Sequence, residues 1–207
     1  MFKKVIWKTV AQSGELKFHK DCKFRATDGF MIANAKMFSE WNILPNHYAG
    51  MTVLDMGCGS KLRSLYFDKS KVIAMDPLAN QFMDEIEWCD LKLADEVYSV
   101  PAEYYVKELQ NKIDLIMCIN VLDHCYDTEK ILENMLNYIK PTGSILISVD
   151  VEHGLHHLHP NPIGKGKLLD WYGYGHNKTA KILDDNCKPY GMGKKFTIIG
   201  NPLAVNG

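Results

Sequence analysis

The chain has 207 residues, with 25 acidic and 24 basic side chains, so its net charge is −1. This length suits a single domain, and the hydrophobic fraction of 46% is that of an ordinary soluble globular protein. A nearly neutral chain without a basic stretch is atypical of a protein that binds nucleic acid through phosphate contacts. We therefore expect no nucleic-acid partner.

The sequence also lacks the features of secretion, membrane insertion and zinc binding. No apolar run approaches the roughly 18 residues that a membrane helix needs, and the first ten residues do not resemble a signal peptide. The six cysteines form no C-x-x-C pair, and several lie within apolar runs. We expect a cytoplasmic protein with reduced cysteines, no metal site and no membrane contact.

Strands and helices alternate through the middle of the chain. The first 29 residues show no clear periodicity and are predicted to be irregular, whereas the apolar residues between positions 30 and 44 recur at helical spacing. Short helices are also predicted over residues 62–67 and after Thr128, which can cap its helix. Strands are predicted at residues 52–54, 71–75, 97–100, 113–120 and 145–149. The alternation predicts an α/β fold with a doubly wound, mostly parallel, Rossmann-like sheet and helices on both faces.

The C-terminal quarter gives a weaker pattern. Residues 151–175 are rich in His, Gly and Pro and are predicted to be a loop, followed by a short helix over 179–186 and a strand over 196–199. No second strong strand is visible there. An incomplete sheet has an open edge that invites pairing, so a homodimer is one of the arrangements that the sequence leaves open.

A glycine-rich turn between the first two strands carries the most specific signal. Asp55 precedes Gly57-Cys58-Gly59 directly after the first strand, and Asp76 ends the second strand. Glycines let a ligand approach the backbone, and open α/β sheets bind ligands at the carboxyl ends of their strands. Asp76 comes 19 residues after Gly57, the spacing at which an acid reaches the ribose hydroxyls of a nucleotide. We expect its carboxylate to serve this ligand and not the stability of the fold.

Dinucleotides and S-adenosylmethionine both bind at such a glycine turn, and the charge of the turn indicates which of the two it binds. A dinucleotide site needs a third glycine, but Leu62 occupies that position. Asp55 would repel a pyrophosphate, whereas it can organise the cationic aminopropyl end of S-adenosylmethionine, directly or through water. The turn therefore favours S-adenosylmethionine over NAD, with a glycine turn beside incidental aspartates as the purely structural alternative.

With these motifs the chain resembles the class I S-adenosylmethionine-dependent methyltransferases, in particular the methyltransferase type 11 domain. Asp55-x-Gly57-x-Gly59 is similar to their first motif, and Asp76 to their ribose-binding acid. Further similarity lies at residues 100–103, 113–116, 120–124 and 140–144, and in total it covers about residues 30 to 150. We expect one methyltransferase domain over residues 1–207, in which 1–29 are an arm or lid, 30–150 the cofactor-binding core, and 151–207 an acceptor-side loop and C-terminal element.

The resemblance also implies contacts to the cofactor. The turn would pass under the methionine part, with Asp55 ordering its amino group, and Asp76 would hold the ribose. Adenine would meet the residues that follow the second and third strands, and a backbone carbonyl after the fourth strand would approach the sulfonium. The residues so implied are Asp55, Gly57, Cys58, Gly59, Asp76, Pro77, Leu78, Ala102, Glu103 and Asn120. Arg25 can clamp the cofactor carboxylate, or it is a surface arginine on a mobile arm.

Two groups of residues are candidates on the acceptor side. Asp123 and His124 follow the fourth strand, where the fold faces the methyl acceptor, although they can equally begin a helix or cap a turn. Four histidines follow the fifth strand, at positions 153, 156, 157 and 159. His153 or His159 can act as a general base. The alternatives are solvated loop histidines and, with a spacing that matches no structural zinc pattern, a metal site.

We therefore expect S-adenosylmethionine-dependent methyl transfer to a small polar acceptor, at oxygen in preference to nitrogen. The alternatives are a cofactor-binding subunit that activates a partner without catalysis, and an RNA methyltransferase.

Overall fold

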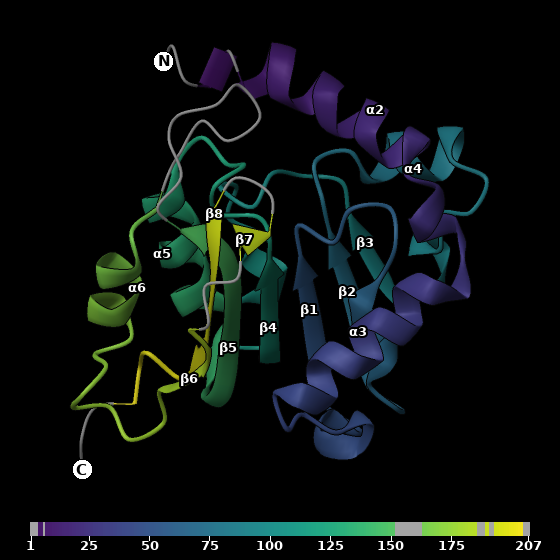
Figure 1. Ribbon diagram of the computed structural model, residues 1–207. Coiled ribbons are helices and arrows are strands. Elements are labelled where there is room, and N and C mark those ends of the chain that lie inside the picture. The colour runs from purple at the N-terminus through teal and green to yellow at the C-terminus, as the bar shows by residue number, and fades with distance from the viewer. Residues whose placement is uncertain (1–3, 6, 152–162, 186–188, 191–192, 205–207) are drawn as a thin grey trace.

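The computed structural model describes residues 4–5, 7–151, 163–185, 189–190 and 193–204. Its centre is a mixed sheet in which helices cover both faces (Figure 1). The strands are β1 (Thr52–Met56), β2 (Lys71–Met75), β3 (Glu96–Tyr98), β4 (Ile113–Ile119), β5 (Ile139–Val151), β6 (Lys181–Asp184), β7 (Pro189–Tyr190) and β8 (Gly193–Gly200). The α-helices are α2 (Gln12–Asp21), α3 (Asp28–Glu40), α4 (Ala79–Glu85), α5 (Thr128–Tyr138) and α6 (Lys165–Trp171).

The strand order is β3-β2-β1-β4-β5-β8-β6, with β7 paired to β8. The pairs among β1 to β5 are parallel, whereas β8 runs antiparallel to both β5 and β6. The chain moves outward from β1 to β3 and then returns to place β4 on the other side of β1. This reversal confirms the predicted doubly wound, mostly parallel sheet, and it sets the ligand-binding crevice at the carboxyl ends of β1 and β4.

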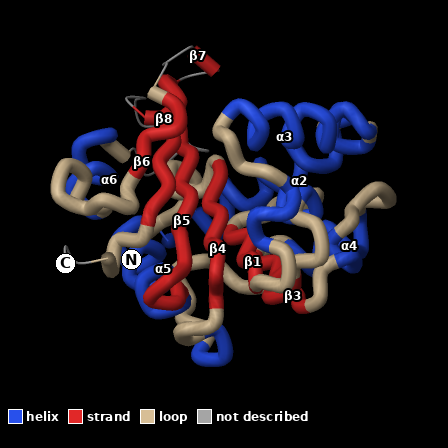
Figure 2. The backbone as a smooth tube through the Cα atoms, turned by 90° about the horizontal axis from the view of Figure 1, so that it is seen from below, coloured by secondary structure: helices blue, strands red, loops and turns tan. Residues whose placement is uncertain are grey.

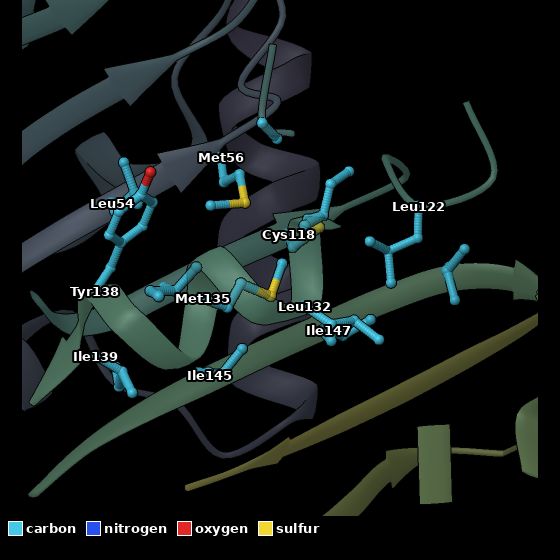
Figure 3. Close-up of a cluster of buried hydrophobic side chains, with 14 of the residues drawn as sticks. Leu54, Met56, Cys118, Leu122, Leu132, Met135, Tyr138, Ile139, Ile145 and Ile147 are labelled. Carbon is cyan, nitrogen blue, oxygen red and sulfur yellow. The ribbon is translucent and has the colours of Figure 1, made fainter. Parts of the chain in front are cut away.

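Alternating side chains of the strands contribute to three buried hydrophobic clusters, one on the α5 face of the sheet and two on the opposite face. In β4, Ile116 and Cys118 point toward α5, and Leu115, Met117 and Ile119 point toward the opposite face. The α5 face buries Leu132, Met135 and Tyr138 of the helix against the central strands (Figure 3). The other face is covered by α3, while α4 packs farther toward the β3 edge, an arrangement that is visible from below the molecule (Figure 2). Because every central strand is covered on both faces, each reads as a nearly continuous apolar run.

Several predicted elements are confirmed, and their ends differ by a few residues. β2 has the predicted bounds. β1 contains its predicted range and extends to Met56, and β4 ends one residue before its predicted end. The helix expected over 30–44 is α3, which ends at Glu40 before Asn42 takes a left-handed φ of 57°. The short helix after the glycine turn is a 3-10 helix at Arg63–Tyr66, and β5 begins already at Ile139.

The N-terminal and C-terminal expectations were wrong in three places. Residues 12–21 form helix α2 and are not irregular. The helix has no apolar stripe that the sequence could reveal, because the residue that it buries is the polar His19. The expected helix over 179–186 is strand β6, which pairs with β8. A short apolar run such as Ile182–Leu183 fits either element, and the sheet edge decides it. Helix α6 lies within the predicted loop over 151–175.

β6 and β8 together complete the C-terminal half of the sheet within this chain. The missing strand that motivated a homodimer is therefore present, on the N-terminal side of β8. Among the described residues, no helix has the length and apolar character to cross a membrane.

Asp127, and not Thr128 as predicted, caps α5, because its Oδ1 accepts the backbone N–H of Lys130 at 3.2 Å. We expect Asp127→Ala to lower the free energy of unfolding by about 1 kcal/mol, the typical cost of losing an N-cap side chain. Equilibrium urea denaturation measures this difference. Lys130→Ala on the exposed side of the same helix is the control and should change stability by less than about 0.5 kcal/mol. Equal effects of the two substitutions would contradict the cap assignment.

Candidate active site

A cavity of about 350 Å³ opens at the carboxyl ends of β1, β2 and β4. Its volume falls in the range of small-molecule sites, roughly 300–1,000 Å³. Its wall includes the glycine turn after β1, the loops after β2, β3 and β4, and the covering helix α2. Most of the predicted cofactor residues line it: Arg25, Gly57, Cys58, Gly59, Asp76, Pro77, Leu78, Ala102, Glu103 and Asn120.

The glycine turn is conformationally fixed. Gly57 and Gly59 have φ values of +70° and +65°, in the left-handed region that side chains disfavour. A Cβ on Gly57 would lie 2.4 Å from Val121, and one on Gly59 would lie 2.4 Å from His19. The missing side chains thus make room for other parts of the protein, in addition to any room they leave for a ligand.

The carboxylate of Asp76 holds this turn through hydrogen bonds to the backbone. Its Oδ2 accepts the N–H of Gly59, and its Oδ1 accepts the N–H of Leu78, both at 2.9 Å. Burial raises the pKa of the Asp76 carboxyl to about 6, against the opposing effect of these two hydrogen bonds. The carboxylate therefore also holds two backbone groups in place, and the survival of the fold without it stays a prediction.

Asp55 is the predicted cofactor residue that does not line the cavity. It is 3% exposed, and its Oδ2 accepts the N–H of Ser64 at 3.1 Å. Burial raises the pKa of the Asp55 carboxyl, and the neighbouring Arg63 opposes this rise. Asp55 therefore lies behind the wall, where it anchors the start of the 3-10 helix that carries Arg63.

Two arginines face the cavity from different segments. The Arg25 and Arg63 guanidinium carbons lie 4.9 and 5.2 Å from the centroid of the Phe30 ring. Burial and the charge of the nearby Arg25 together lower the pKa of Arg63 to about 10, so Arg63 remains charged at neutral pH. Arg25 Nη1 is buried and has no hydrogen-bond partner among the described residues. Arg63 was not predicted, although its place four residues after the glycine turn offers a signal.

Residues after β3 form a rigid wall opposite the turn. Glu103 Oε1 accepts the N–H of Tyr126 at 2.9 Å, and burial raises the pKa of its carboxyl. The carbonyl of Ala102 accepts a hydrogen bond from Asn134 Nδ2 at 2.8 Å. Glu103 is thus fixed to the loop just before α5, and Ala102 to the middle of that helix.

The loop after β4 brings His124 into the cavity but leaves Asp123 behind it. Asp123 is 1% exposed, while Asn120 lines the cavity with a left-handed φ of 57° and contacts Lys195 through its side chain. The predicted bases His153 and His159 lie outside the described residues, as do the other two histidines of that cluster. Among the described residues, no three side chains gather in a way that could hold a metal ion.

Helix α2 covers this cavity through polar contacts that the sequence does not reveal. His19 Nδ1 accepts the N–H of Ser60 at 3.2 Å and lies 2.6 Å from its Oγ, and burial lowers the His19 pKa to about 3. Glu15 Oε1 lies 2.9 Å from His124 Nδ1. Trp7 Nε1, just before the helix, donates to the His124 carbonyl at 2.8 Å. The predicted lid segment therefore does contact the site.

Known proteins resemble this chain in sequence and in fold. A family model described as a methyltransferase domain matches residues 32–185. The tRNA U34 carboxymethyltransferase of Campylobacter curvus is 26% identical over 145 residues, which cover 66% of this chain and 48% of that protein. The ubiquinone biosynthesis O-methyltransferase of Pseudomonas paraeruginosa is 27% identical over 106 residues, covering 48% of this chain and 44% of that protein.

Solved structures agree in architecture at lower identity. The 1,6-didemethyltoxoflavin-N1-methyltransferase of Burkholderia thailandensis, solved with S-adenosylhomocysteine, aligns with a TM-score of 0.54 and 17% identity over 93% of this chain and 90% of that one. A SAM-dependent methyltransferase from Aquifex aeolicus aligns with a TM-score of 0.55 and 18% identity over 91% and 96% of the two chains.

The fold is that of the class I S-adenosylmethionine-dependent methyltransferases. The chain belongs to the methyltransferase domain family, whose model covers most of its length. It spans about half the length of the curated relatives that it matches.

The raised pKa of Asp76 makes stability depend on pH. The folded chain holds this proton more tightly than the unfolded chain, so the resulting stability is complete below pH 4 and is lost as the pH rises through 6. At 1.36 kcal/mol per pKa unit, the loss is about 2–3 kcal/mol. Relative to wild type, Asp76→Asn should therefore gain this amount in free energy of unfolding between pH 4 and pH 7.

Urea denaturation at both pH values measures the change, and Asp84→Asn, at an exposed position, is the control for removing a carboxylate elsewhere. An identical pH dependence in wild type and Asp76→Asn would show that Asp76 is not the responsible group.

Proposed function

We propose that this chain binds S-adenosylmethionine in the cavity beneath α2 and transfers its methyl group to an oxygen of a small polar acceptor. One observation carries the proposal: the buried Arg63, the half-buried Arg25 and the carboxylate of Asp76 line the same cavity. The arginines suit the carboxylate of an amino acid, and the acid suits ribose hydroxyls. An amino acid joined to a nucleoside presents both groups.

The chain's residues fit the cofactor in position as well as in charge. Arg25 and Arg63 would bind the methionine carboxylate, since a guanidinium matches a carboxylate in two-point geometry. Asp76 would receive the ribose hydroxyls beside the turn that it closes. Pro77, Leu78 and Ala102 offer apolar surface to the adenine ring. The buried Asp55 would act on the cofactor only indirectly, through Arg63.

His124 is our candidate general base. Its imidazole lines the cavity directly after β4, where the fold faces the acceptor. When bound, the sulfonium supplies the methyl group and a good leaving group, so the acceptor oxygen gains the methyl carbon as the carbon–sulfur bond breaks. His124 would take the hydroxyl proton that this oxygen loses. The remaining contribution of the chain is to hold the acceptor in line and to exclude water. His153 and His159 stay candidates for the same task.

We propose a small hydroxylated molecule as the acceptor. The ubiquinone O-methyltransferase relatives and the nearly neutral chain favour a small molecule with a hydroxyl group. The carboxymethyltransferase relatives, which act on tRNA according to their name, make RNA the second candidate. A cofactor-binding subunit without catalysis is the third.

A binding titration followed by a turnover assay tests the proposal. We expect calorimetry to show binding of S-adenosylmethionine and S-adenosylhomocysteine but not of NAD. Release of S-adenosylhomocysteine should then follow addition of the small-molecule fraction of a cell extract, with purified tRNA as the parallel arm. Turnover with tRNA alone would move the acceptor to RNA, and binding without turnover in either arm would favour the non-catalytic subunit. Preferential binding of NAD would overturn the cofactor assignment.

Arg25 provides a sharper test of how the cofactor lies. Arg25→Met removes one of the two cations, so S-adenosylmethionine should bind roughly 10- to 150-fold more weakly, the equivalent of one hydrogen-bonded charge. Methylthioadenosine has no carboxylate, and its affinity should hardly change. Calorimetry with both ligands measures the contrast, and Lys23→Met, at an exposed position two residues away, is the control. Equal losses for the two ligands would place the carboxylate elsewhere.

A further inference from the structure

The proposed cofactor carries an ammonium group on its methionine part, and the residues assigned so far leave this group without a partner. Arg25 and Arg63 suit its carboxylate, and Asp76 suits its ribose. Asp55, which was expected to order the amino group, is 3% exposed and does not line the cavity. A cation that moves from water into a buried space needs an anionic or hydrogen-bonding partner. Another acceptor in the cavity must therefore take this role.

The carboxylates of the cavity differ in how far their oxygens are already used. Among the described residues, those that line the cavity are Glu15, Asp76, Glu103 and Asp150. Both oxygens of Asp76 accept backbone N–H groups, Glu103 holds the backbone before α5, and Asp150 pairs with a lysine of β8 at 3.2 Å. Glu15 Oε1 lies 2.9 Å from His124 Nδ1, whereas its Oε2 makes no hydrogen bond or ion pair with the described residues. One oxygen of Glu15 is thus available to a ligand.

Glu15 faces the part of the cavity between the glycine turn and the loop after β4. Its helix, α2, runs across the carboxyl ends of the central strands (Figure 1). Glu15 lies four residues before His19, so the two side chains share one face of the helix. The His19 ring contacts the turn, because a Cβ on Gly59 would lie 2.4 Å from it, and on the other side Glu15 reaches His124. The methionine part of the cofactor is expected between these two contacts.

The charge of Glu15 also reaches the groups that would hold the rest of the cofactor. Burial lowers the pKa of Arg25, and the negative charge of Glu15 opposes this change. Burial raises the pKa of Asp76 to about 6, and the charge of Glu15 adds to the rise. The Glu15 carboxylate therefore lies within electrostatic range of both the proposed carboxylate subsite and the proposed ribose subsite.

A second polar atom of α2 indicates that this face of the helix meets a ligand. Gln12 lines the cavity three residues before Glu15, and its Oε1 is buried without a hydrogen-bond partner among the described residues. A buried acceptor that stays unpaired is destabilising, and in native structures such an atom calls for a partner. The cavity face of α2 thus presents acceptor oxygens that a ligand with N–H donors would satisfy.

We infer that Glu15 is a cofactor-binding residue, whose carboxylate accepts a hydrogen bond from the ammonium group of S-adenosylmethionine. The inference rests on the proposed function, in which the cofactor occupies this cavity. Arg25 and Arg63 would then hold the carboxylate while α2 holds the ammonium, so that the amino-acid end is recognised by both of its charges. Helix α2 therefore selects the ligand in addition to covering it.

Calorimetry with a matched pair of ligands tests the inference. One ligand is S-adenosylhomocysteine, and the other is its desamino analogue, in which hydrogen replaces the ammonium group. Glu15→Gln removes the charge but keeps the side-chain length and an oxygen for His124. We expect it to weaken S-adenosylhomocysteine by about 10-fold, the low end for one hydrogen bond to a charged group, because the amide oxygen retains a neutral hydrogen bond. The affinity of the desamino analogue should stay unchanged, which also shows that the variant is folded.

Asp21→Asn is the control, because Asp21 is an exposed acid at the end of the same helix, where it pairs with Lys17. It should change neither affinity. Equal losses of the two ligands in Glu15→Gln would mean that Glu15 only secures α2, and this result would overturn the inference, as would an unchanged affinity for S-adenosylhomocysteine. The wild-type protein distinguishes these outcomes from failure of the proposed function, which would show as no binding of S-adenosylhomocysteine to the wild type at all.

Discussion

The site depends on one buried carboxylate that holds a left-handed backbone turn. Asp76, at the end of β2, binds the amide of Gly59 beyond the end of β1, so two neighbouring strands share one connection at their carboxyl edge. The turn that results presents two bare α-carbons. Val121, after β4, packs against one, and His19, from α2, packs against the other. The loop after β4 and the covering helix α2 are therefore both positioned against this turn.

Charge is distributed unevenly around the cavity. Arg25 and Arg63 approach from the side of α3, where they share the Phe30 ring. The carboxyl groups of Glu15, Asp123 and Asp150 surround His124 on the other side. Two like charges in a buried space raise the free energy of the empty protein, and an anionic ligand group relieves that cost. The proposed cofactor brings such a group to the arginine side and leaves the histidine side for the acceptor.

The fold was largely predictable because its central strands are buried on both faces, which leaves an unmistakable apolar run followed by glycine or aspartate. The same reasoning found the turn, Asp76 and the loops that line the cavity. It could not find α2 or the pairing of Glu15 with His124, since a contact across 109 residues leaves no trace in local periodicity. β6 was misread for a related reason: four residues of mixed polarity become a strand only because β8 offers them an edge. Arg63 and Asp127 could have been predicted from the sequence. Arg63 follows the glycine turn, and Asp127 directly precedes the apolar pattern of α5.

The antiparallel strand β8 has a consequence for how the protein is made. It lies between β5 and β6 in the sheet, although it follows both in the chain. During synthesis, β6 leaves the ribosome before the strand that it must pair with, and it has no neighbour in the sheet until residues 193–200 have emerged. The part of the sheet formed by β8 and β6 therefore assembles after translation of this segment, whereas β1 to β5 can pair earlier. A nascent chain that stalls before β8 exposes the edge of β5, a surface on which chaperones or other chains can bind.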